Sequence, residues 1–204
     1  YDEAHTPWDW HKAIFEHAEK RGIICFSSPF DETAVDLLES LNNPIYKIAS
    51  FEINHIPLLK YIAKTGKPVI MSTGASSLSE IAEAVNVLKR EGCENLTLLK
   101  CTSTYPATAE NSNLNTIPHL KELFNCEVGL SDHTMGIGVA VAAIAKGANV
   151  IEKHFCLDRS EGGVDSAFSL EPAEFKQLVI EAKNAYLALG KINYGITNDE
   201  KKVD

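Results

Sequence analysis

The sequence lacks several features by which whole classes of protein are recognised. It has no apolar run long enough to cross a membrane and no run rich in lysine and arginine, so neither a membrane nor a nucleic acid is an expected partner. Its five cysteines form no CxxC pair, and we expect free, buried thiols in a reducing cytoplasm rather than disulfides or a zinc site. With a net charge of −9, the chain is more typical of proteins that act on small molecules.

What the chain does contain is a repeating order of strand and helix. Short runs that are nearly continuous in apolar residues indicate strands buried on both faces of a parallel sheet. Six such strands are predicted, within IICFSSPFD, IYKIASFE, KPVIMSTGA, LTLLKCTSTYP, CEVGLSDHT and NVIEKHF. Helical patterns are predicted at about 6–22, 31–41, 56–65, 78–90, 117–124, 137–146 and 171–189. The 204 residues are enough for one domain of good size.

The ends of the predicted strands distinguish two architectures. A doubly wound sheet needs polar residues only at its switch point, whereas a (β/α)8 barrel brings every strand end to one central site. Here all six ends carry polar groups, and no GxGxxG follows the first strand. We therefore predict the α/β class and a TIM barrel, with about six of its eight units in residues 1–190. Residues 191–204, which are charged and poor in apolar residues, are predicted to begin a linker.

Two histidines mark the ends of the last two predicted strands. His133 follows GLSD, and His154 follows VIEK one strand and helix later. Neighbouring parallel strands end at the same edge of a sheet, so the two imidazoles would meet there and could bind a divalent metal with positions left open. A single histidine at a strand end is more often only a hydrogen-bonding residue. The repetition of the pattern favours a metal or catalytic role.

Hydroxyls and one lysine form a candidate site for a phosphate or carboxylate. Lys47 lies within an apolar strand and must find an anion there, because burial without a partner is costly. Glu52 is a candidate for proton transfer, and Asp165, after two glycines, for binding sugar hydroxyls or amides. Plain surface, turn or helix-capping roles remain open for these residue types. The hydroxyls are those of Ser28, Ser50, Ser72 and Ser131.

Five motifs, in this order and spacing, resemble the sialic acid synthase family, which condenses phosphoenolpyruvate with an amino sugar. They are KIASFE, STGAS, KCTSTYPA, GLSDHT and EKHFCLDRSEGGVDSAFSLEP. The likeness runs from about Thr6 to Gly195. The SFE, CTSTYPA and GGVDSAFSLEP forms are most similar to the branch that makes pseudaminic acid from 2,4-diacetamido-2,4,6-trideoxy-altrose.

The resemblance implies a cytoplasmic transferase that forms a carbon–carbon bond. Mn²⁺, or another divalent ion such as Mg²⁺ or Co²⁺, would be bound by His133 and His154, with Glu52 as the catalytic glutamate. Tyr105 and Asp165 would contact the sugar. Phosphoenolpyruvate would be bound by Ser28, Lys47, Ser50, Ser72, Ser131 and Ser103, the last of which stands where sialic acid synthases tend to have asparagine.

The family pattern also includes segments that this sequence does not contain. The resemblance implies two further strands before Tyr1, with another lysine, and a C-terminal antifreeze-like domain that reaches the partner subunit of a homodimer. We therefore expect a fragment with two open barrel edges, an aggregation liability, which binds ligand weakly and turns over negligibly on its own. The alternatives are an N-acetylneuraminate or legionaminate synthase of the same mechanism, another metal-dependent barrel lyase or aldolase, and a truncated barrel without catalysis.

Overall fold

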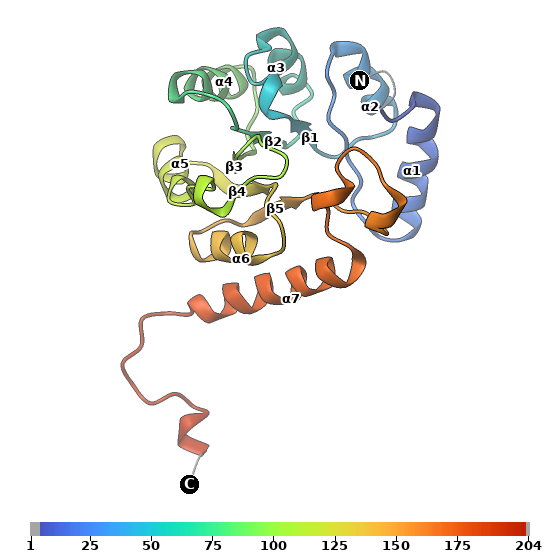
Figure 1. Ribbon diagram of the computed structural model, residues 1–204. Coiled ribbons are helices and arrows are strands. Elements are labelled where there is room, and N and C mark those ends of the chain that lie inside the picture. The colour runs from blue at the N-terminus through green and yellow to red at the C-terminus, as the bar shows by residue number, and fades with distance from the viewer. Residues whose placement is uncertain (1–4, 203–204) are drawn as a thin grey trace.

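The computed structural model describes residues 5–202; the first four residues of the chain and the last two lie outside the described part. Figure 1 shows the strands at the centre of the molecule with the helices around them. The strands form one parallel sheet whose order follows the chain, β1-β2-β3-β4-β5. They are β1 (Tyr46–Ile48), β2 (Val69–Ser72), β3 (Leu96–Cys101), β4 (Glu127–Asp132) and β5 (Val150–Lys153).

Seven helices of more than one turn lie in residues 5–202, at the places where the sequence predicts them. Local signals begin several of them. Asp31 accepts a hydrogen bond from the Ala34 N–H group at 2.8 Å, and Ser77 forms a capping box with Glu80. The helices are α1 (Trp8–Lys20), α2 (Glu32–Ser40), α3 (Ile56–Ala63), α4 (Leu78–Arg90), α5 (Thr116–Phe124), α6 (Gly138–Ala145) and α7 (Pro172–Leu189).

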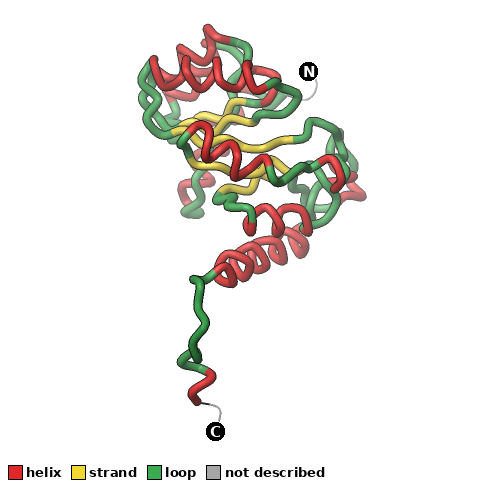
Figure 2. The backbone as a smooth tube through the Cα atoms, turned by 90° about the vertical axis from the view of Figure 1, so that its left-hand side faces the viewer, coloured by secondary structure: helices red, strands yellow, loops and turns green. Residues whose placement is uncertain are grey.

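The sheet has a packed outer face and an inner face that is polar toward the carboxyl ends of the strands. Ile48, Met71, Leu98 and Val128 lie side by side across four strands, and all four are buried in the core that the surrounding helices complete. Figures 1 and 2 show the helices on the outside of the sheet. Because side chains alternate along a strand, residues of the opposite register point away from the helices, toward the interior. Helices on one side only, with strands in chain order, are typical of a barrel rather than a doubly wound sheet.

Contacts between the two edge strands show how strongly the sheet curves. In a flat sheet, β1 and β5 would lie about 19 Å apart, which is four strand spacings of about 4.8 Å. Instead, Lys47 Nζ in β1 lies 3.5 Å from Glu152 Oε2 in β5. The sheet must therefore curl until its edges face each other across the interior. The predicted α/β fold of TIM-barrel type is confirmed, as a five-stranded half-barrel.

The first predicted strand is not formed, and this part of the prediction is wrong. In IICFSSPFD only Ser27 makes an isolated parallel bridge, with Tyr46. Within the described residues, β1 is the only strand beside this segment. Ile23 and Ile24 are 65% and 69% exposed, so they gain little of the burial that stabilises a strand. The sequence of an apolar run does not show whether other strands will pair with it on both sides.

Helix α7 packs on α6 through a small second core of Ala140, Leu170 and Leu178. Beyond Gly190 the chain leaves the α/β unit (Figures 1 and 2), and residues 191–202 are exposed. A domain division at residue 190 stays a prediction.

All five cysteines are free, as predicted, although only Cys93 and Cys101 are fully buried. No helix within residues 5–202 is both long and apolar enough to span a membrane.

Candidate functional site

Near their carboxyl ends, β3, β4 and β5 carry a row of polar side chains on the inner face of the sheet. Cys101 lies opposite Ser131, and Ser131 lies opposite Glu152. Leu130, the residue before Ser131 in β4, points to the opposite face and belongs to the main core. Because side chains alternate along a strand, the row faces the barrel interior. This is the carboxyl edge of the sheet, where barrel proteins place their functional groups.

Lys47 has the acidic partner that its burial demands. It is 7% exposed, and its Nζ atom donates to Ser72 Oγ at 2.9 Å. Glu152 completes the group with Oε2 at 3.5 Å from Nζ and with Oε1, which accepts a 2.6 Å hydrogen bond from Ser131 Oγ. The sequence places Glu152 among the polar groups at the strand ends but does not assign it a role in the site. The available signal was its position two residues before a strand-end histidine, hence on the same face of β5.

A cavity of about 490 Å³ extends from this ion pair toward the N-terminal segment. Ser28 lines it together with Lys47 and Glu152, and Trp8 and Phe26 line its apolar part. Ser28 thus shares a cavity with the lysine, as a joint anion site would require. An aromatic wall next to buried charge is the usual composition of a small-molecule pocket.

The absence of a side chain at Gly74 leaves room for the hydroxyl groups of Ser50 and Ser103. Its N–H group donates to Ser50 Oγ at 3.0 Å. A Cβ atom built on Gly74 would lie 2.2 Å from Ser103 Oγ, 2.8 Å from Ser50 Oγ and 2.9 Å from Cys101 Sγ, closer than real atoms approach. Nothing in the sequence pattern marks this glycine as part of the site. Only glycine lets these three side chains lie so close to the backbone.

The two histidines meet as the sequence predicts. Their ring centroids lie 5.3 Å apart with an interplanar angle of 65°. His133 is 7% exposed, and its Nδ1 atom lies 2.9 Å from the Thr102 carbonyl oxygen. Tyr105 covers His133, with ring centroids 4.3 Å apart, and lies 6.1 Å from the ring of His154. Three side chains from two strand ends and the loop after β3 therefore form one aromatic cluster.

The environments of the two imidazoles differ. Burial and the neighbouring His133 lower the pKa of His154, so its neutral form, the form that binds metals, is favoured. Burial opposes the charged form of His133, but contacts with Cys101 Sγ and the Thr102 carbonyl raise its pKa. The pKa of the Cys101 thiol is held at about 7, because hydrogen bonds from His133 and hydroxyls outweigh burial.

The chemistry of this pair fits a divalent metal. A backbone carbonyl acceptor at Nδ1 of His133 favours a proton there and leaves Nε2 free, the arrangement found behind most metal-bound histidines. No three His, Cys, Asp or Glu side chains form a metal-binding cluster within residues 5–202. Residues of the described chain would therefore supply two imidazole ligands, His133 and His154, and leave other positions to water or substrate.

Glu52 lies in the single turn that follows β1, Ser50–Glu52. Its Oε2 atom is buried and has no hydrogen-bond partner among the described residues. Burial raises the pKa of Glu52, although its own backbone N–H group and the charge of Lys47 oppose this effect. A carboxyl group with a raised pKa, held near a charged site, is a candidate for proton transfer.

Asp165 reaches the histidines because the loop after β5 folds back. The Leu170 N–H group donates to the His154 carbonyl at 2.9 Å, and the Cys156 N–H group donates to the Leu170 carbonyl at 3.0 Å. These bonds close the loop at its base. Asp165 Oδ2 then lies 3.5 Å from His154 Nδ1. Asp165, which from the sequence alone could have been only a turn residue, is therefore part of the candidate site.

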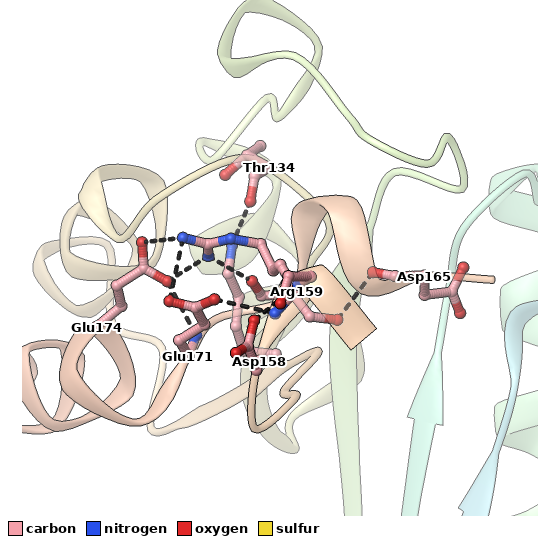
Figure 3. Close-up of polar contacts among 9 residues, drawn as sticks. Thr134, Asp158, Arg159, Asp165, Glu171 and Glu174 are labelled. Atoms are coloured by element: carbon pink, nitrogen blue, oxygen red, sulfur yellow. Dashed lines mark hydrogen bonds and ion pairs between the residues drawn. The ribbon is translucent and has the colours of Figure 1, made fainter. Parts of the chain in front are cut away.

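Arg159 fastens this loop to the start of α7. Its two terminal nitrogens donate to the carboxylate of Glu174 at 2.5 Å and 3.1 Å, and one of them also donates to the Ser169 carbonyl at 2.9 Å. Figure 3 shows Arg159 directed toward Glu171 and Glu174, with Asp165 on the other side of the loop. A two-bond contact of this kind has a defined geometry, so it restricts the positions that the loop can take.

Comparison with known proteins agrees with these observations. The sequence profile of the NeuB family matches residues 1–194. A pseudaminic acid synthase of Campylobacter jejuni is 49% identical over 190 residues, which cover 93% of this chain and 55% of that protein. An N,N'-diacetyllegionaminic acid synthase of the same species is 48% identical over 182 residues, covering 88% and 54%. The chain spans about half the length of the curated relatives it matches.

Among solved structures, an N-acetylneuraminic acid synthetase from Leptospira borgpetersenii, in complex with citrate, superimposes with a TM-score of 0.91. It is 35% identical, and the match covers 98% of this chain and 70% of that one. The curled sheet and the helices around it are therefore shared with a solved protein over nearly the whole chain.

Proposed function

The chain belongs to the NeuB family, and on that premise we propose that its strand ends form part of the active site of a phosphoenolpyruvate-dependent nonulosonic acid synthase. The acceptor sugar is 2,4-diacetamido-2,4,6-trideoxy-altrose, and the products are pseudaminic acid and phosphate. The observation that carries the proposal is the meeting of Lys47, a group of hydroxyls and the pair His133 and His154 at one edge of the sheet.

Phosphoenolpyruvate has two anionic groups, and the inner face offers donors for them. Lys47 supplies a fixed positive charge, and short hydroxyls donate hydrogen bonds to oxyanions. Both stand where water is largely excluded, because Ser72 and Ser131 are 2% and 3% exposed. The proposed binding residues are Ser28, Lys47, Ser50, Ser72, Ser103 and Ser131.

The sugar would lie on the side of the histidines. His133 and His154 would hold Mn²⁺, or another divalent ion such as Mg²⁺ or Co²⁺. When bound, this ion supplies a Lewis acid for the aldehyde oxygen of the open-chain sugar. Tyr105 and Asp165 both contact the histidine pair, so they would border the sugar and orient its hydroxyl and acetamido groups.

The reaction then needs one new carbon–carbon bond and one proton acceptor. C3 of phosphoenolpyruvate forms the bond to the aldehyde carbon of the sugar, whose oxygen takes up a proton from solvent and becomes a hydroxyl, and C2 becomes electron-poor. Water adds to C2 while Glu52 takes its proton, a role suited to the raised pKa of this carboxyl group. The tetrahedral adduct loses phosphate by cleavage of its C2–O(phosphate) bond, while the hydroxyl added at C2 gives its proton to the departing phosphate and becomes the keto oxygen. Glu52 returns the other proton of the water to solvent, and Lys47 with the hydroxyls stabilises the leaving anion.

The test is phosphate release by the protein expressed from its natural gene, with whatever residues flank these 204. Mn²⁺, phosphoenolpyruvate and one of three sugars are supplied: the altrose sugar, N-acetylmannosamine, or a diacetamido sugar of manno configuration. Release with the altrose sugar alone is the expected result. The 204-residue chain, tested in parallel, is expected to turn over negligibly.

Other outcomes assign the other candidates. The second relative, at 48% identity, favours a legionaminic acid synthase as runner-up, and release with the manno sugar would establish it. Release with N-acetylmannosamine would establish the sialic acid branch. Phosphate release from phosphoenolpyruvate with any of the sugars would exclude a lyase or aldolase that uses a pyruvate-like donor, and no reaction with any sugar would favour a barrel without catalysis. We also propose that the protein is cytoplasmic and forms a homodimer. Sedimentation of the purified protein tests the homodimer, and cell fractionation tests the location.

Gly74→Ala is expected to raise KM for phosphoenolpyruvate about tenfold or more, because the added methyl group would displace Ser50 and Ser103 from the anion site. Steady-state kinetics with varied phosphoenolpyruvate measures this. Gly138→Ala is the matched control, since an added Cβ there has no atom within 4 Å. An unchanged KM in the Gly74 variant would remove these two hydroxyls from the proposed phosphoenolpyruvate site.

A further inference from the structure

A second ion pair lies directly behind the two histidines. Asp132 and Lys153 occupy the last paired position of the β4–β5 ladder, one residue before His133 and His154. Lys153 Nζ lies 2.8 Å from Asp132 Oδ2, and both side chains are only 1% exposed. Their register places them on the outer face of the sheet, whereas the histidines that follow lie with the inner cluster.

The same pair holds the backbone on both sides of His133. Asp132 Oδ1 accepts hydrogen bonds from the Thr134 N–H group at 2.9 Å and from Thr134 Oγ1 at 2.8 Å. Lys153 Nζ also donates to the Thr134 carbonyl, the contact marked at Thr134 in Figure 3. Residues 132 and 134 are thus both tied to the residue that precedes His154.

Stability alone is a weak reason for this arrangement. Desolvation of two buried charges consumes much of their attraction, and neutral side chains of similar size are often equally stable in such positions. Neutral apolar side chains could not make the short, oriented hydrogen bonds by which this pair joins the ends of β4 and β5. This junction is where the ladder ends and the two histidines begin.

We propose that Asp132 and Lys153 are positioning residues that hold the imidazoles of His133 and His154 at metal-binding separation. The proposal deepens the proposed function, on whose two-histidine site it rests. Removal of the cross-strand bond would let the two strand ends separate, with little effect on the rest of the fold.

The test variant is Asp132→Asn/Lys153→Met. Asparagine keeps an acceptor for Thr134, and the double change removes both charges together, so no buried charge is left alone. The control is Glu39→Gln/Lys67→Met, which neutralises another close ion pair, of 2.6 Å, whose side chains are 39% and 26% exposed. Lys67 precedes β2, so the control pair lies at the opposite end of the sheet. All forms are compared by thermal unfolding.

Two readouts separate positioning from stability. In metal-free protein, a nuclear Overhauser contact between the ring protons of His133 and His154 reports their separation. Mn²⁺ titration followed by electron paramagnetic resonance gives the affinity. We expect the Asp132/Lys153 variant to lose the ring contact and to bind Mn²⁺ at least about tenfold more weakly, whereas the control changes neither.

Wild-type values in the test variant for both readouts would overturn the proposal, and so would equal losses in the control at equal melting temperature. Should the test variant not fold, Lys153→Arg keeps the charge but moves it, and the same two readouts must change. If wild-type protein binds no Mn²⁺, the proposed metal site fails, and the ring contact alone decides whether the pair positions the histidines.

Discussion

Lys47→Met is expected to lower kcat/KM for phosphoenolpyruvate by about 10²- to 10³-fold, because it removes the positive charge of the anion site. The stability of the fold should change little by comparison. Glu152, the carboxylate left behind, has a side chain that is 40% exposed and can therefore be hydrated. Steady-state kinetics and thermal unfolding of the same preparation measure the two effects.

Lys67→Met is the control for Lys47→Met, since it removes a lysine whose partner is Glu39 rather than a residue of the site. It should leave kcat/KM near the wild-type value. Equal kinetic losses in the two variants would mean that charge removal anywhere in the sheet perturbs the fold. A Lys47 variant with wild-type kinetics would contradict the assignment of Lys47 to phosphoenolpyruvate.

Gly129→Ala is expected to destabilise the fold by about 3 kcal/mol or more, because the fourth and fifth strands cannot stay paired around an added methyl group. A Cβ atom at Gly129 would lie 2.2 Å from the Val150 carbonyl oxygen and 2.7 Å from Leu99 Cδ2. Backbone cannot rotate away as a side chain can, so β5 would have to move, and His154 with it.

Denaturant-induced unfolding measures this loss, and Gly138→Ala again serves as the control. At Gly138 the added methyl group meets no atom within 4 Å, and alanine in a helix is favoured over glycine by about 1 kcal/mol or less. The control should therefore be as stable as the wild type or slightly more so. A Gly129 variant with an unchanged unfolding midpoint would contradict the tight strand spacing described here.

Sequence patterns predicted the parts of this structure that depend on local chemistry. A lysine within an apolar strand required an anionic neighbour, and two histidines one strand apart had to meet at one edge. The identity of the neighbour was not predictable, because Glu152 is 105 residues from Lys47 and meets it only through the curvature of the whole sheet. The space at Gly74 likewise depends on side chains from the end of β3 and from the segments that follow β1 and β3.

Two features could not be predicted because they depend on the neighbours of a segment in the fold and not on its own sequence. The run at residues 23–29 has the composition of a strand, yet Ile23, Ile24 and Phe26 are exposed, and β1 is the only strand within residues 5–202 that pairs with the run. Asp165 was assigned to the sugar by resemblance, but its position beside His154 results from the loop that Leu170 closes. Neither pairing nor loop closure is encoded in the residues of the segment itself.

The alternation along β4 restricts how this region can diverge between related proteins. Gly129 and Ser131 face the interior, while Leu130 and Asp132 face the helices. An insertion or deletion of one residue within this stretch would exchange the two sets and bury the wrong side chains on each face. We therefore expect β4 to accept substitutions but not the insertion or deletion of a single residue. The loop between His154 and Leu170 is joined at its base, so its length can change without moving β5.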